Sequence, residues 1–157
     1  MFTEISWLEN KTYKYYINTD SVILRKTKKS LACKVLMPYI RSINKPDKRL
    51  CLNINKRTYN VHILMAMTYL NKTFKNGGLT VNHIDYNPYN NKLSNLEMVT
   101  HFDNIVHYNS LSNEEKKDQS DKNYNTMYDL ISFNSEQYLN YIYSGNIPQE
   151  VLDFIQR

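Results

Sequence analysis

Glycine and cysteine are scarce in this chain, and no long stretch of it is apolar. Only 3 of its 157 residues are glycine and 2 are cysteine. Cys33 and Cys51 cannot make a four-ligand zinc site by themselves, so we interpret them as reduced thiols in or near the core. No window approaches the roughly 18 apolar residues of a membrane span, and the start MFTEISWLEN lacks the pattern of a secretory signal. We therefore expect an intracellular protein that is not secreted and has no membrane partner.

The hydrophobic and aromatic content of the chain is that of a folded protein. Hydrophobic residues make up 41% of the chain and aromatic residues 13%, with 14 tyrosines against 5 phenylalanines. This is enough for a packed core, and the length suits one compact domain with an appendage or two small domains. Asparagine and lysine are plentiful, as AT-rich codons favour, so their abundance alone carries little weight.

Charge is distributed unevenly along the chain. Residues 1–75 hold 15 Lys and Arg against 4 Asp and Glu, whereas residues 111–157 hold 4 against 8. The formal net charge of +5 hides this asymmetry. The first half therefore favours a polyanionic partner, and the tail does not.

Short apolar or aromatic runs, separated by charged or turn-forming residues, fill residues 12–62. The runs are TYKYYIN, SVILRK, KVLMPYI, RLCLNI and TYNVH. They predict short, mostly antiparallel strands, including a hairpin with Asn55, Lys56 and Arg57 at its tip. Next, HILMAMTYLN, residues 62–71, predicts a buried helix.

A strand, a long turn-rich loop, a second strand and a helix are expected between residues 79 and 109. LTVNHI and NLEMVT have the composition of strands, and DYNPYNNKLS between them is rich in turn-forming residues. Thr100 and Asp103 have capping-box spacing, so a helix should begin at His101 and end near Asn109.

The remaining residues are polar at first and then amphipathic. LSNEEKKDQSDKNYN, residues 111–125, is a candidate linker or a solvated helix. Residues 126–157 have a helical pattern, an acidic balance and enough Tyr, Leu and Ile to bind a protein partner. We expect an α+β fold with a basic β-rich module at 1–60, a core at 61–110, a polar linker at 111–125 and a helical acidic tail at 126–157.

VNHIDYNPYNNKLSNLEMVTHFDN, residues 81–104, preceded by YNVHILMAMTYL, resembles the HNH nucleases of the phage and intron homing-endonuclease group. Their usual pattern is VH-x-LVA-x-x-F followed by VNHIDGN-x-x-NN-x-x-SNLEWVT-x-x-EN. The resemblance covers roughly residues 4–110 and is strong over 60–107. It implies a ββα-metal core, preceded by a small basic DNA-binding module that ISWLENKTYKYYIN and SVILRK resemble more loosely.

The resemblance assigns roles by position. His83 matches the family's first histidine, the general base, and Asn95 matches the middle asparagine, which would hold the strand of His83 in register across the loop. Asn82 and Asn104 would ligate one divalent ion, Mg²⁺ or Mn²⁺, for which oxygen ligands are suited. Asp85 and His107 are secondary candidates. His62 is a further one, although a structural histidine is the better interpretation there.

Two positions depart from the family pattern, and a third carries a variant that the pattern contains. Tyr86 stands where the family usually has glycine, so a bulky residue occupies a turn that favours positive φ. Met98 replaces a tryptophan, which the core should tolerate. Asn82 is the variant that the pattern contains, and in place of an aspartate it removes a negative charge from the metal site.

The function that the resemblance implies is metal-dependent hydrolysis of DNA phosphodiester bonds, of nicking or homing type, in a virus or mobile element. Its setting would be the cytoplasm, the nucleus or a viral factory. The alternatives are a catalytically inactive nucleic-acid-binding protein with the same fold and a viral structural or interaction protein. DNA phosphates would be bound by basic residues of the first half, which can also be interpreted as solvated charges that protect strand edges. They are Arg25, Lys26, Lys28, Lys29, Lys56 and Arg57.

Overall fold

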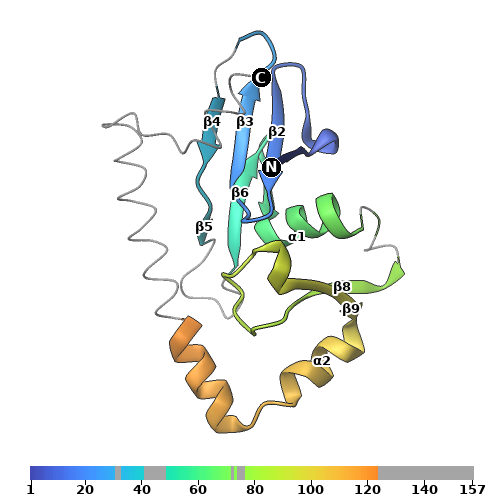
Figure 1. Ribbon diagram of the computed structural model, residues 1–157, viewed down its shortest axis with the longest axis vertical. Helices are drawn as coiled ribbons and strands as arrows, with labels where there is room; N and C mark the ends of the chain where they lie inside the picture. The colour runs from blue at the N-terminus through green and yellow to red at the C-terminus, as the bar shows by residue number, and fades with distance from the viewer. Residues whose placement is uncertain (31–32, 41–48, 72, 74–76, 124–157) are drawn as a thin grey trace.

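Antiparallel strands and short helices make up the computed structural model, which describes residues 1–30, 33–40, 49–71, 73 and 77–123. The strands of residues 2–60 lie at one end, and α1 (Val61–Met65) lies at the middle (Figure 1). The pair of β8 (Leu79–His83) and β9 (Leu96–Thr100) lies with α2 (His101–Asn109) at the other end. The predicted α+β class is confirmed. Within the described residues, no helix is both long and apolar enough to cross a bilayer.

A four-stranded antiparallel sheet with the order β1-β2-β3-β4 forms the first layer. Its strands are β1 (Phe2–Glu4), β2 (Tyr13–Asn18), β3 (Ile23–Thr27) and β4 (Cys33–Leu36). The aromatic and β-branched runs predicted as strands account for β2, β3 and β4. The edge strand β1 was not predicted, because three residues carry too little pattern and owe their strand form to pairing with β2.

A smaller sheet contains β5 (Tyr39–Ile40), β6 (Leu50–Ile54) and β7 (Arg57–Asn60). The single run KVLMPYI is divided between the two sheets: β4 pairs with β3, and β5 pairs with β6. Pro38 lies between them, and a proline has no N–H to donate to a continuous ladder.

The β6–β7 hairpin is present and tighter than predicted. Asn55 and Lys56 both have positive φ, 52° and 63°, as a two-residue type I′ turn requires. Arg57 is the first residue of β7 and pairs with Ile54. The Asn55 amide also donates to the Leu8 carbonyl oxygen at 3.0 Å, which ties the hairpin to the N-terminal segment.

The predicted buried helix is present as α1 (Val61–Met65), continued by a π-helical turn, Ala66–Leu70. Val61, Leu64, Met65 and Ala66 are fully buried. They join one apolar cluster whose members come from the sheets on one side and from β8 and β9 on the other. Burial of this face, rather than propensity over so short a helix, therefore holds α1 in place.

The strand, loop, strand and helix predicted for residues 79–109 are confirmed. They are β8 (Leu79–His83), β9 (Leu96–Thr100) and α2 (His101–Asn109). Val81 pairs with Met98 in the antiparallel ladder. The Thr100 hydroxyl accepts from the Asp103 N–H at 3.1 Å, which is the N-cap that the sequence predicts.

The predicted boundary at residue 60 falls inside the shared core. The same cluster contains Ile17 and Ile54 from one side of it and Val81 and Leu96 from the other. Residues 113–123 are helical, the second of the two alternatives for the polar segment. The expected helices of residues 126–157 lie outside the described residues.

Candidate active site

A cleft of about 660 Å³ lies where β8, the loop after it, α2 and the helix at 113–123 meet. Asn82, His83, Asn104 and His107, all named from the sequence, line it together. Asn95, Asp85 and His62 do not line it. The four cleft residues are up to 25 positions apart in the chain, and the β8–β9 ladder with the capped α2 brings them together.

His83 is the last residue of β8 and is 7% exposed. Its Nε2 lies 3.2 Å from the Asn91 side-chain oxygen. Because that oxygen can only accept, Nε2 carries the proton, and Nδ1 is the unprotonated nitrogen of the neutral ring. Burial lowers the pKa of His83, the hydrogen bond to Asn91 opposes this, and the positive charge of Arg49 lowers it further. The ring is therefore held in its proton-accepting form.

Asn82 is 6% exposed and is fixed through its amide nitrogen. Its Nδ2 donates to Glu97 Oε1 at 2.7 Å and lies 3.2 Å from His107 Nδ1. An amide nitrogen only donates, so His107 Nδ1 must be the acceptor. The Asn82 carbonyl oxygen is then the atom left for a ligand of the cleft.

Asn104 lies on α2, one turn before His107, and is half-buried in the cleft wall. Amide oxygens of Asn82 and Asn104 suit a hard cation such as Mg²⁺ or Mn²⁺, with water and phosphate completing the coordination. No group of three or more His, Cys, Asp or Glu residues that could hold a metal occurs in the described part of the chain. The donor set thus fits a weakly held hard cation and does not fit zinc.

Asn95 closes the loop between β8 and β9. Its side-chain oxygen accepts from the Asp85 N–H at 3.0 Å, and its Nδ2 donates to Asp85 Oδ1 and to the Asn90 carbonyl oxygen, both at 2.8 Å. These bonds cross the loop and attach Asn95 to the backbone that follows His83.

Asp85, a secondary metal candidate, has its carboxylate engaged in the same loop. Besides the bond from Asn95, Oδ1 accepts from the Asn87 N–H at 2.8 Å and Oδ2 accepts from Asn90 Nδ2 at 2.7 Å. This arrangement makes Asp85 a loop-stabilising residue.

His62, the other histidine near the base, is buried in α1. Its ring meets that of His83 edge to face, with centroids 5.5 Å apart. This contact packs the ring of His83 from the core side. It agrees with the structural interpretation of His62.

Tyr86 adopts the positive φ that its position in the pattern predicts, at 60°. For a residue with a side chain this conformation costs roughly 1–2 kcal/mol. The ring of Tyr86 stacks on that of His107, with centroids 4.1 Å apart and planes 4° from parallel. The tight turn is therefore kept in spite of the substitution.

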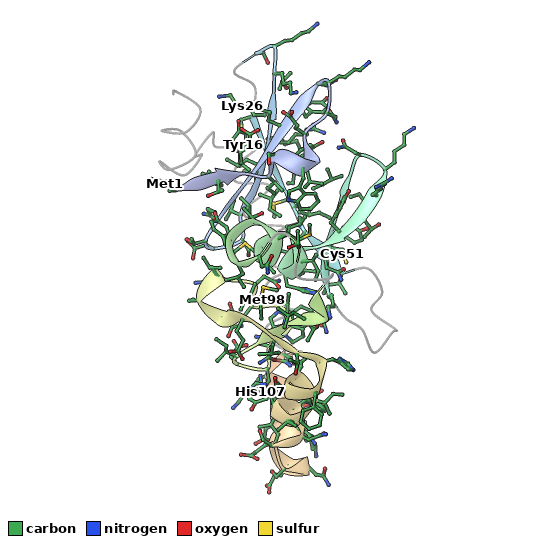
Figure 2. The ribbon with its side chains drawn as sticks, turned by 90° about the vertical axis from the view of Figure 1, so that its right-hand side faces the viewer. Met1, Tyr16, Lys26, Cys51, Met98 and His107 are labelled. Atoms are coloured by element: carbon green, nitrogen blue, oxygen red, sulfur yellow. The ribbon has the colours of Figure 1, made fainter. Side chains whose placement is uncertain are left out.

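None of the six basic residues predicted to bind DNA lines the cleft. Lys26 and His107 lie toward opposite ends of the molecule in Figure 2. Lys26, Lys28 and Lys29 line a separate shallow hollow at the β3–β4 turn. Lys28 also pairs with Glu9 at 3.2 Å, and Arg25 stacks over the Tyr13 ring at 4.3 Å.

The sequence reasoning missed two residues of the site. Asn91 is 2% exposed and sets the tautomer of His83. Arg49 lines the cleft and is not among the basic residues chosen from the sequence. The double asparagine of the motif was the available signal for Asn91. No local signal pointed to Arg49, which lies 34 positions before His83.

Comparison with known proteins points to HNH endonucleases. No protein-family profile matches the chain. An uncharacterized HNH endonuclease of Acanthamoeba polyphaga mimivirus is 35% identical over 127 residues, covering 76% of this chain and 35% of that protein. The chain thus spans about a third of the length of this curated relative.

A solved structure, described in terms of DNA binding and cleavage by the HNH homing endonuclease I-HmuI, superposes with a TM-score of 0.50. It is 22% identical, and the match covers 75% of this chain and 64% of that one. At that identity the match shows the fold. Together the two comparisons confirm the resemblance of this chain to HNH endonucleases.

Proposed function

We propose that the protein is a metal-dependent DNA endonuclease that hydrolyses one phosphodiester bond per active site. The observation that carries this proposal is the cleft itself, in which a buried histidine with an unprotonated Nδ1 lies with two amide side chains and basic residues. The names of the relative and of the structural neighbour support the same activity. The viral source of the relative agrees with a virus or mobile element as the setting.

His83 takes the proton from the attacking water through Nδ1, while Nε2 keeps its own proton in the bond to Asn91. Asn95 and Asp85 hold the loop that follows the base. A divalent ion held by the oxygens of Asn82 and Asn104 would supply positive charge for the developing phosphate oxyanion. Because two neutral oxygens bind such an ion weakly, tight binding awaits the DNA phosphate.

Two basic side chains of the cleft serve the scissile phosphate. Arg49 and Lys116 line it from distant parts of the chain, and Lys116 Nζ lies 4.9 Å from the centre of the Tyr108 ring. The six basic residues of the sheets would contact phosphates further along the duplex, with little sequence preference. In this division of roles, the basic residues of the sheets retain DNA, and the residues that line the cleft cut it.

The test is nicking of supercoiled plasmid with Mg²⁺ or Mn²⁺ by the wild type and by His83→Ala. Loss of a general base should slow cleavage by about 10²–10⁴-fold, while retardation of DNA in gels stays unchanged. Asp20→Ala, at an exposed ion pair with Lys92 outside the cleft, is the matched control and should cleave normally. If the wild type never nicks although it retards DNA, the protein is a non-catalytic DNA-binding member of this fold.

A further inference from the structure

Tyr86 and His107 form a contact that the proposed chemistry does not use. Beyond the ring stack, the Tyr86 hydroxyl lies 3.4 Å from the His107 carbonyl oxygen and 3.4 Å from Ser110 Oγ. Asn123 Nδ2 donates to the Tyr86 carbonyl oxygen at 3.1 Å. The loop after β8 is thereby attached both to α2 and to the helix at 113–123.

His107 also touches the amide of Asn82 through Nδ1, at 3.2 Å. With Glu97 accepting from the same nitrogen at 2.7 Å, two acceptors from two elements face one amide group. An asparagine side chain can otherwise rotate to present either its nitrogen or its oxygen, and only the oxygen can bind a cation. Two acceptors on the nitrogen remove that choice.

We propose that His107, held in place by the stacked Tyr86 ring, is a positioning residue that makes Asn82 present its oxygen to the divalent ion. The proposal rests on the proposed function, because it concerns the same metal site. Outer partners that orient a metal ligand typically change metal affinity by about 10–100-fold when they are removed. Tyr86 then contributes to metal binding by holding the ring of His107 in place.

The variant Tyr86→Gly distinguishes this proposal from the simpler interpretation that the turn accommodates Tyr86 and the ring has no role in metal binding. A glycine adopts a φ of 60° without the penalty that a tyrosine bears, but it has no ring to support His107. If the turn alone matters, Tyr86→Gly should leave metal binding unchanged or improve it. If the stack positions His107, Tyr86→Gly should weaken metal binding while it relaxes the backbone.

Metal binding can be measured without cleavage in a His83→Ala background, which lacks the proposed base. Mn²⁺ is titrated into the full-length protein with a short DNA duplex present. Free Mn²⁺ is followed by electron paramagnetic resonance, and binding by the duplex alone is subtracted. We expect His107→Leu and Tyr86→Gly each to weaken Mn²⁺ binding by about tenfold or more.

Conservative variants test whether the acceptor and the ring are responsible. His107→Asn, whose side-chain oxygen can stand in for Nδ1, should recover part of the affinity, and Tyr86→Phe, which keeps the ring, should bind nearly as the parent does. Phe102→Ala removes an exposed ring from the same helix and should change nothing. Thermal unfolding followed by circular dichroism checks each variant, and His107→Gln replaces His107→Leu if the latter is unfolded.

The outcomes separate the two proposals. A His83→Ala parent that binds no Mn²⁺ above the DNA background overturns the metal site and the inference with it. A parent that binds Mn²⁺, beside Tyr86→Gly and His107→Leu variants that bind it equally well, overturns the inference alone. Equal losses in His107→Leu and His107→Asn also overturn it, because the acceptor would then be irrelevant.

Discussion

The N-terminal sheet (β1–β4) and the ββα unit (β8, the loop after it, β9 and α2) differ in the kind of residue that they bury. In the sheet the buried residues are mainly apolar, such as Ile17, Ile23 and Leu24. Of the six buried polar or charged residues in the described part of the chain, four belong to the ββα unit: Asn82, His83, Asn91 and Asn95. A buried polar group must find partners, so these side chains are constrained by one another. The basic side chains of the sheet are exposed or half-buried, and none of them is fully buried.

The largest expected difference between the two regions concerns stability, at Asn95. Asn95→Ala leaves the Asp85 N–H without its acceptor and removes two further hydrogen bonds. We expect a loss of about 2–3 kcal/mol in the free energy of unfolding, measured by urea denaturation. Lys29→Ala, a surface change in the sheet region, should stay within about 0.5 kcal/mol.

A second variant at the same position sharpens this test. Asn95→Asp keeps an acceptor for the Asp85 N–H. It also replaces the amide nitrogen that donates to Asp85 Oδ1 at 2.8 Å with a carboxylate oxygen, so two negative charges lie side by side. It should also destabilise the protein, and less so in acid, where one carboxyl can hold a proton. Wild-type stability in both Asn95 variants would mean that the loop does not depend on these bonds.

A smaller effect is expected from charges at the hairpin tip, and it should appear in DNA binding. Removing Lys56 and Arg57 together should weaken DNA retention and lower the slope of log affinity against log salt by about 2, one for each lost phosphate contact. The rate of cleavage at saturating DNA should not change. The measurement is fluorescence anisotropy of a labelled duplex at several salt concentrations.

The matched control removes two exposed lysines that were not predicted to bind DNA, Lys92 and Lys117. The net charge of this double variant equals that of the hairpin variant. If both variants change the slope of log affinity against log salt equally, net charge alone governs DNA binding, and the hairpin tip makes no phosphate contacts of its own.

Local pattern explains which parts of the fold could be predicted. The strands, the loop and the Thr100 cap of the ββα unit follow from residues close together in the chain. The strand β1 could not be predicted in this way, because it depends on pairing with β2. The π-helical turn after α1 was also missed, because helical periodicity does not distinguish it from an α-helix.

The same distinction applies to the site. The family resemblance implied that Asn82 and Asn104 ligate one ion beside the base His83, and all three residues line one cleft. Arg49 and the stack of Tyr86 on His107 depend on how distant segments pack. A sequence pattern can mark Tyr86 as unusual, but only the fold shows what its ring touches.

The smallest expected effect concerns the proton equilibrium of His83. Burial is the main reason that the pKa of His83 is lowered, so the unfolded chain binds this proton more readily than the folded one. Stability should be unaffected well above the ordinary histidine pKa, about 6.5, and should fall as pH decreases from there through the lowered value. His83→Gln removes this group and offers a side-chain amide in place of Nε2 toward Asn91, and the other three histidines are common to both proteins. Between pH 7 and pH 5, urea denaturation should therefore show a greater loss in the free energy of unfolding for the wild type than for His83→Gln. An equal loss in the two proteins would mean that His83 takes up its proton in the folded protein as readily as in the unfolded chain.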